Sequence, residues 1–259
     1  MKSKNRLYSA SVILLAAVLT VIHTVALLTT YDTEVGYFES TPLVLILRIT
    51  YAIGTAWCVA VPFLMPTPSS RPQTILRLTF KHFAAILLLF SGISALAKSF
   101  GTTSLTTPSI LPILGILAAL SSSFFFTAPT TDKKPGTAHA LCGFVVLAFL
   151  FCFLFHVYFD MHVTINSPLK TALQLSILSA MLFILFEIRS ALGKPMPRIT
   201  LAPRLLCILF CIPTAVAHLF FGASELCGVL ERTVISPVLS LPLLAIGAFA
   251  LSELNFNKE

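Results

Sequence analysis

Ionisable side chains within or beside long apolar segments are the first candidates for chemistry in this sequence. They are His23, Arg48, His156, Asp160, His218 and Glu225. Charged and titratable groups at membrane depth are costly, so they mark functional sites by default. Imidazoles and carboxylates bind cations or divalent metals and relay protons. Counted along the segments, the histidines and Arg48 fall in the outer third of a bilayer and the carboxylates lie above them, which predicts an outward-facing vestibule.

Helical spacing supports this vestibule, but a structural alternative competes with it. His156 and Asp160 are four residues apart and His218 and Glu225 are seven apart, so each pair shares a face if its helix continues. The alternative is that polar residues near helix ends anchor the protein at the membrane surface. Arg48 would then extend to the headgroups or pair with an acid of the first outer loop. No HExxH or CxxC motif occurs, so neither a metal site nor a cofactor is predicted.

A second set of charges lies where one apolar segment ends and the next begins. Glu187 and Arg189 close the first segment, and Lys194, Arg198 and Arg204 lead into the second. Residues two apart on a helix face different directions. We therefore expect Glu187 to form an inner ion pair with Arg204 or Lys194. The alternative is a gate, since charged helix ends mark transport pathways in some carriers.

Composition indicates that the apolar segments lie in lipid. The chain has 259 residues, of which 57% are hydrophobic and 10% are charged, and its mean hydropathy is +0.95. Soluble domains carry about 25% charged residues. The net charge of +7 comes from short connections and not from a basic helix with interleaved aromatics, so no nucleic-acid partner is expected. The prediction is an all-α polytopic protein of the cell membrane.

About eight segments are long and apolar enough to be transmembrane helices, which need ~20 residues each. The predicted spans are 7–30, 42–65, 80–99, 108–128, 137–158, 168–192, 203–222 and 236–254. The first follows Lys2, Lys4 and Arg6 and resembles a signal peptide. Its apolar stretch is too long for one and lacks a small-residue cleavage site. We therefore predict an uncleaved first helix.

The distribution of positive charge predicts the orientation of the chain, because cytoplasmic loops are enriched in Lys and Arg. With the amino terminus in the cytoplasm, the outer connections hold Lys98, Lys170 and Arg232. The inner segments hold Lys2, Lys4, Arg6, Arg71, Arg77, Lys81, Lys133, Lys134, Arg189, Lys194, Arg198, Arg204 and Lys258. Both termini are therefore predicted to be cytoplasmic.

Ser-Pro and Thr-Pro pairs open every second predicted helix, at Thr41-Pro42, Thr107-Pro108, Ser167-Pro168 and Ser236-Pro237. A hydroxyl caps free helix N–H groups, and Pro at the first helical position loses no hydrogen bond. The recurrence also favours a parallel tandem repeat of four plus four helices, with halves 1–134 and 135–259. The alternative is chance similarity between apolar helices that begin in the same way.

Two segments carry a resemblance to a known group. They are YDTEVGYF at 31–38, and FEIR at 186–189 together with LGKPMPR at 192–198. These segments resemble uncharacterised multi-pass membrane proteins from Gram-positive bacteria. The resemblance implies a multi-pass topology and no assigned activity, so it assigns no site residue.

The sequence leaves two classes of function open. The absence of a dense polar core favours a structural or accessory component that assembles with other membrane proteins or with copies of itself. The vestibule and the repeat favour a small-solute or ion transporter. No GxSxG, P-loop, paired intramembrane aspartates or Gly-rich nucleotide motif occurs, so enzyme activity is not predicted. The lipid bilayer is the one partner that the composition implies.

Overall fold

The protein is all-α, as predicted. The computed structural model describes residues 2–64, 75–100, 110–127, 136–161, 163–164, 166–194, 196–227 and 237–254. The helices in these residues are α1 (Lys2–Thr30), α2 (Pro42–Leu64), α3 (Ile75–Phe100), α4 (Ile110–Thr127), α5 (Thr137–Phe159), α6 (Pro168–Ala191), α7 (Pro197–Ala223) and α9 (Pro237–Ser252). Two short strands, β1 (Tyr31–Asp32) and β2 (Tyr37–Phe38), pair antiparallel between α1 and α2.

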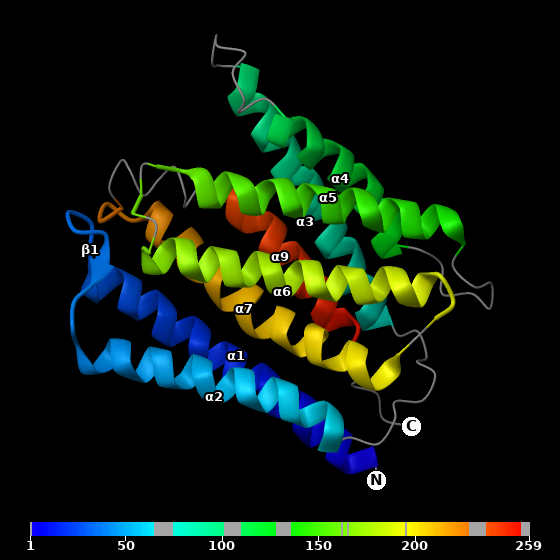
Figure 1. The fold of residues 1–259 in the computed structure, drawn as a ribbon, viewed down its shortest axis with the longest axis horizontal. Coiled ribbons are helices and arrows are strands. Elements are labelled where there is room, and N and C mark those ends of the chain that lie inside the picture. The colour runs from blue at the N-terminus through cyan, green and yellow to red at the C-terminus, as the bar shows by residue number, and fades with distance from the viewer. Residues whose placement is uncertain are drawn as a thin grey trace.

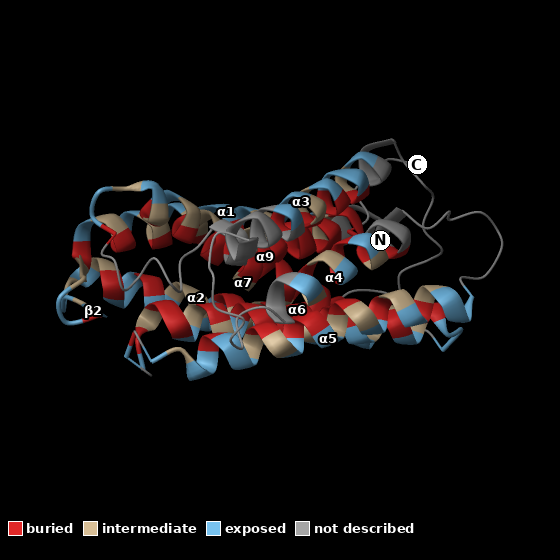
Figure 2. Ribbon diagram, turned by 90° about the horizontal axis from the view of Figure 1, so that it is seen from above, coloured by how far each residue is buried: buried red, intermediate tan, exposed pale blue. Residues whose placement is uncertain are grey.

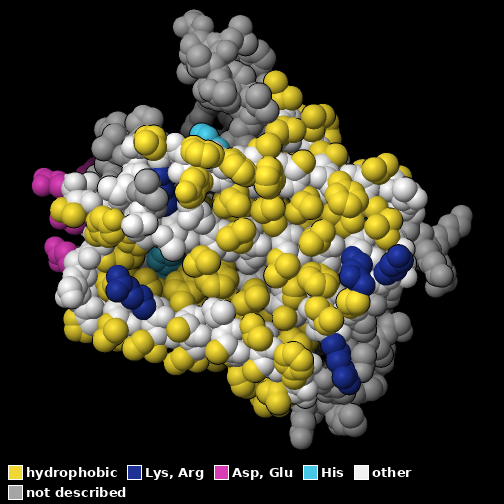
Figure 3. All heavy atoms as spheres, in the orientation of Figure 1, with side chains coloured by type: hydrophobic (Ala, Val, Ile, Leu, Met, Phe, Trp, Pro, Cys, Tyr) yellow, Lys and Arg dark blue, Asp and Glu magenta, His cyan; other side chains and the backbone are white. Residues whose placement is uncertain are grey.

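Five of these helices are long and apolar enough to cross a membrane: α1, α2, α5, α6 and α7. The described side chains of α3, α4 and α9 form shorter apolar stretches, so spanning by these three helices stays a prediction. Large apolar side chains are exposed along most of the helices, and Figure 3 shows one such face. An exposed apolar surface of this extent is suited to lipid. The protein is therefore a multi-pass membrane protein.

Helix α7 lies at the centre of the bundle (Figure 1). It contacts α1, α2, α6 and α9, and a chain of contacts runs from α6 through α5, α4 and α3 back to α9. Buried residues line the inner faces of the helices, as Figure 2 shows from above. The β1–β2 hairpin lies at one end of the bundle, the hairpin end. Helix α1 begins and α9 ends at the opposite end, the termini end.

The hairpin is held by local hydrogen bonds and by one aromatic contact. Gly36 has φ +77°, a backbone conformation that glycine adopts without strain. The Asp32 carboxylate accepts the backbone N–H of Glu34 at 2.8 Å. The Tyr31 ring lies edge-on to Phe221 of α7, with 5.5 Å between ring centroids. The hairpin is thereby fixed against the central helix.

Helix α7 begins at Pro197, earlier than the predicted start at residue 203. Pro197 lies in the first turn, where a missing N–H loses no hydrogen bond. Pro203 and Pro213 lie inside the helix, where surrounding helices compensate for the lost bonds. The predicted start at residue 203 was therefore six residues late, and Arg204 lies in the third turn of the helix and not at its first residues.

Three helices begin at the predicted prolines, namely α2, α6 and α9. The prediction that a hydroxyl caps them was wrong for two. Ser167 makes no side-chain cap, and its hydroxyl lies 3.5 Å from that of Tyr31. The Thr41 hydroxyl has no hydrogen-bond partner among the described residues. The remaining predicted helix starts include Thr107, Pro108 and Ser236, which lie outside the described residues.

The described packing does not show the tandem repeat. In a repeat of four plus four helices, α3 and α7 would be counterparts. Helix α7 has four main neighbours at the centre, whereas the main neighbours of α3 are α4 and α9. The expected boundary between residues 134 and 135 lies outside the described residues. The repeat therefore stays a hypothesis from the sequence.

Two helix crossings depend on glycine. A Cβ atom on Gly54 of α2 would lie 3.0 Å from side-chain atoms of both Leu15 in α1 and Leu209 in α7. A Cβ atom on Gly143 of α5 would lie 2.5 Å from Cγ1 of Ile188 in α6. Small residues let membrane helices approach closely, and van der Waals packing then holds them together.

Replacement of Gly143 tests this packing. Gly143→Ala should lower the melting temperature in detergent, because overpacking a tight contact costs ~1–3 kcal/mol. The matched control is Gly115→Ala in α4, where a Cβ atom would meet only Phe149 at 3.4 Å. Melting temperatures of the two variants and the wild type, measured by Trp57 fluorescence, check the prediction. Equal stability of the two variants would contradict the close α5–α6 crossing.

Candidate functional site

A groove lies between α2 and α6 in the half of the bundle nearest the hairpin end, and we call it the lateral groove. Its volume is about 460 Å³, within the ~300–1,000 Å³ typical of ligand pockets. A hollow on this face, with a His side chain visible inside it, is seen in Figure 3. The lining residues are His23, Tyr37, Phe38, Val44, Leu47, Arg48, Tyr51, Ala52, Thr55, Asn166, Pro168, Thr171, Ala172, Leu175, Phe210 and Thr214.

Imidazole and aromatic rings form the floor of the lateral groove. His23 Nδ1 lies 3.0 Å from the Tyr51 hydroxyl, and the Tyr51 ring stacks on Phe210 with 5.5 Å between centroids. Behind this layer, the rings of His23 and His218 meet edge-on at 6.0 Å. Neither ring nitrogen of His218 has a hydrogen-bond partner among the described residues. The two helices that contribute these histidines, α1 and α7, thus bring both predicted imidazoles together beneath the groove.

Arg48 lies at the mouth of the lateral groove. Its side chain is exposed and makes no hydrogen bond or ion pair within the described part of the chain. The alternative that Arg48 pairs with an acid of the first outer loop is therefore not seen. No Asp or Glu is among the described residues that line the groove. The mouth carries an uncompensated positive charge.

Two members of the predicted vestibule lie on α5 or just beyond it. His156 is exposed, because Phe153 and Val157 belong to the buried face of that helix. Asp160 follows the last residue of α5, and its backbone carbonyl accepts a hydrogen bond from the ammonium group of the buried Lys170. Neither His156 nor Asp160 lines the lateral groove.

Glu225 is also separate from the groove. Helix α7 ends at Ala223, so Glu225 lies in the following turn, exposed, and does not share a helix face with His218. The spacing argument failed because it assumed a longer helix. The structure thus gathers His23, His218 and Arg48, and leaves the other three residues outside. No group of three or more His, Cys, Asp or Glu in the described residues could hold a metal ion.

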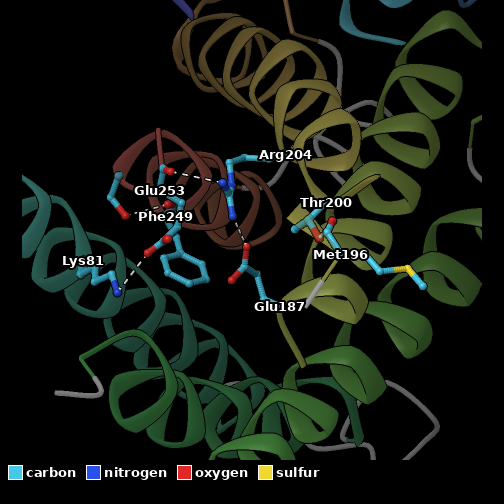
Figure 4. A network of polar contacts seen from close by, with 8 residues as sticks. Lys81, Glu187, Met196, Thr200, Arg204, Phe249 and Glu253 are labelled. Atoms are coloured by element: carbon cyan, nitrogen blue, oxygen red, sulfur yellow. Dashed lines mark hydrogen bonds and ion pairs between the residues drawn. The ribbon is translucent and has the colours of Figure 1, made fainter. Parts of the chain in front are cut away.

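Four charged residues form a second feature at the termini end, which we call the charge cluster (Figure 4). Arg204 of α7 pairs through Nη2 with Oε1 of Glu187 in α6, so the expected ion pair between these two residues is present. Arg204 Nη1 also donates to the backbone carbonyl of Glu253, which follows α9, at 3.2 Å. Lys81 of α3 pairs with the Glu253 carboxylate at 3.0 Å. The charge cluster therefore joins α3, α6, α7 and the end of α9.

Because the charge cluster is buried, each of its charges needs a partner of opposite sign. Arg204 is 1% exposed, Glu253 4% and Lys81 7%. The desolvation of such groups is offset only where each charge has a partner, and removal of one partner costs ~3–5 kcal/mol. Two cations and two carboxylates meet here, so the net charge is zero. Lys81 Nζ also lies 5.6 Å above the Phe249 ring, a favourable cation–π contact.

The sequence identified half of the charge cluster and part of the groove. Lys81 is predicted only to lie in an inner segment and no partner is predicted for Glu253, because chain order does not reveal that α3 packs on α9. A signal was present, since each stands at the end of an apolar segment, where a charged group needs a partner. In the groove, Tyr51 and Thr55 share a face of α2 at a spacing of four. That spacing does not reveal that α6 stands across from it.

Comparisons with known protein families, with curated proteins and with solved structures find no match to this chain. The resemblance to uncharacterised multi-pass membrane proteins of Gram-positive bacteria therefore stays an expectation from two short segments. The lateral groove and the charge cluster are the features of the molecule from which a function follows.

Replacement of Arg204 tests the charge cluster. Arg204→Gln should lower the free energy of unfolding by ~3–5 kcal/mol, because Glu187 remains without its partner. Arg204→Lys should give a smaller loss, since one ammonium group reproduces only part of the guanidinium geometry. The control is Arg189→Gln, an exposed residue at the same end, which should change stability by less than about 0.5 kcal/mol. Equal melting temperatures for Arg204→Gln and Arg189→Gln would show that the cluster is not stabilising.

Proposed function

We propose that the protein is a non-enzymatic accessory component of the cell membrane. Its lateral groove binds a molecule that is already in the bilayer. The observation that carries this proposal is the side opening of the groove. Arg48, Ala52, Thr171 and Leu175 line it and are exposed. A ligand that enters between α2 and α6 thus comes from the surrounding lipid and not along the bundle axis.

The packing in the half of the bundle nearest the termini end supports a protein that does not open and close as a carrier does. Cys58 of α2 and Leu205 and Leu209 of α7 are fully buried there and belong to one continuous apolar core. The charge cluster joins four helices at the same end. A carrier needs a path past these residues during its cycle. Packed apolar side chains and paired charges oppose the opening of such a path.

We further propose that the hairpin end faces outward and that both termini are cytoplasmic. The positive-inside rule supports this orientation, because the described Arg189, Lys194 and Arg198 lie at the termini end. Figure 3 shows Asp and Glu side chains gathered at the hairpin end. The groove then lies in the outer half of the bilayer. The exposed faces of helices such as α5 are available to lipid, to other membrane proteins or to a second copy.

The alternative is a small-solute or ion transporter, and one observation favours it. The His23–His218 contact brings two buried imidazoles together beneath the groove, and neighbouring imidazoles are able to relay protons. In this case the charge cluster would act as a gate. The two functions differ in whether the inner end of the groove ever becomes accessible from the cytoplasm.

Cysteine accessibility distinguishes the two functions. Thr55 lies half-buried at the inner end of the groove. A Thr55→Cys variant in sealed vesicles should remain unlabelled by a membrane-impermeant thiol reagent added to the cytoplasmic side, because the packed core intervenes. The wild type controls for native cysteines, and Lys194→Cys, exposed after α6, should be labelled in the same vesicles. Labelling of Thr55→Cys from the cytoplasmic side would support the transporter.

The same reagent tests orientation in intact cells. Glu34→Cys in the hairpin turn should be labelled, because this exposed residue is assigned to the outer side by the positive-inside rule. Lys194→Cys should be labelled only after the membrane is opened. The reverse pattern would invert the orientation.

A further inference from the structure

We propose that the lateral groove binds one anionic phospholipid, with the phosphate on Arg48 and one acyl chain along α2 towards the middle of the bilayer. The inference rests on the proposed function in one respect, namely that the groove takes its ligand from the bilayer. The proposed function requires a ligand from the bilayer but does not depend on the chemical class of that ligand. Three properties of the groove carry the proposal: length, wall chemistry and charge.

The groove has the length of one leaflet. It follows α2 from Val44 to Thr55, a distance of about 16 Å at a helical rise of about 1.5 Å per residue. Half of a bilayer hydrocarbon core is about 15 Å thick. Arg48 lies about 9 Å along α2 from Pro42 at the same rise. A long Arg side chain bridges such a distance to the headgroup level while its stem stays in lipid.

Three polar side chains of the groove wall already have hydrogen-bond partners, whereas the buried Thr214 hydroxyl has none among the described residues. The Thr55 hydroxyl donates to the Tyr51 carbonyl at 2.8 Å, and the Thr171 hydroxyl donates to the Ser167 carbonyl at 3.1 Å. The Tyr51 hydroxyl is bonded to His23. These residues therefore present methyl groups and ring faces to the groove. Leu47, Leu175 and Phe210 complete an apolar path.

The charge at the mouth selects the headgroup. Arg48 is free of hydrogen bonds and ion pairs within the described chain, and the described residues that line the groove include no Asp or Glu. A guanidinium binds phosphate oxygens through two parallel hydrogen bonds. Asn166 and Tyr37 lie at the same mouth and offer further polar groups. A zwitterionic lipid would bring an ammonium group to a site with no carboxylate to receive it, so an anionic lipid is favoured.

The test measures thermal stabilisation of the purified full-length protein in detergent by added lipid. Phosphatidylglycerol and phosphatidylcholine with identical acyl chains are titrated separately. Trp57, the single tryptophan, donates from Nε1 to the Ser11 hydroxyl at 2.9 Å, so its fluorescence reports unfolding of the α1–α2 contact. Phosphatidylglycerol should reach half-maximal stabilisation at the lower concentration.

Two charge variants test the headgroup contact. Arg48→Gln should raise the half-saturating phosphatidylglycerol concentration about tenfold or more, as expected for one lost charge-assisted hydrogen-bonding group. Phosphatidylcholine carries the same phosphate, so its response should weaken as well, but by less, and the preference for phosphatidylglycerol should shrink. Arg189→Gln removes the same charge at the opposite end and should keep the wild-type preference. Equal effects of the two variants would mean a general charge effect and would overturn the headgroup assignment.

Two volume variants test the chain position. Ala52→Phe fills the groove and should weaken stabilisation by both lipids. Ala60→Phe adds the same group at an exposed site of α2 outside the groove and should not. Equal lipid responses in these variants would overturn lipid binding in the groove. If cytoplasmic reagent labels Thr55→Cys while the lipid results hold, the accessory function fails and the lipid site stands.

Discussion

The Arg204 guanidinium is buried in a membrane bundle, and such a charge requires fixed partners. Glu187 supplies one, the Glu253 carbonyl a second, and Lys81 balances the remaining carboxylate. These partners come from the preceding helix α6 and, far away in the chain, from α3 and the end of α9, so the charges can be satisfied only if these four helices meet at one end. This requirement keeps α7 central and the termini end closed.

Arg48 and the charge cluster, at opposite ends of the molecule, differ in whether the protein itself provides partners for the positive charge. At the termini end every member of the charge cluster is paired inside the protein. At the hairpin end Arg48 has no partner in the described chain, although it lies on an apolar helix. An unpaired guanidinium at this depth is costly unless something outside the protein receives it. The proposed accessory role is to hold a membrane molecule. This role requires one closed end and an open, charged groove at the other.

Much of the fold follows from the sequence because lipid imposes simple rules. The length of the apolar segments predicted the helices, and the Pro residues in the first turns predicted where α2, α6 and α9 begin. The ion pair of Glu187 with Arg204 could also be predicted, since Glu187 is the one acid among the charged residues of that connection. Lys81 and Glu253 were not identified as partners, because long-range helix contacts are not encoded in spacing. The predicted vestibule included too many residues for a similar reason. His156 matches the others in its predicted depth, but it lies on the exposed face of α5.

The central claim is that the charge cluster holds the termini end in one closed arrangement. Distances between spin labels at Leu64, the end of α2, and Leu192, just after α6, measure this directly, because both residues are exposed at that end. Pulsed electron resonance in lipid nanodiscs should give one narrow distance distribution, unchanged when phosphatidylglycerol replaces phosphatidylcholine. Two separated distances, or a shift with lipid, would mean that the termini end opens and would contradict the claim.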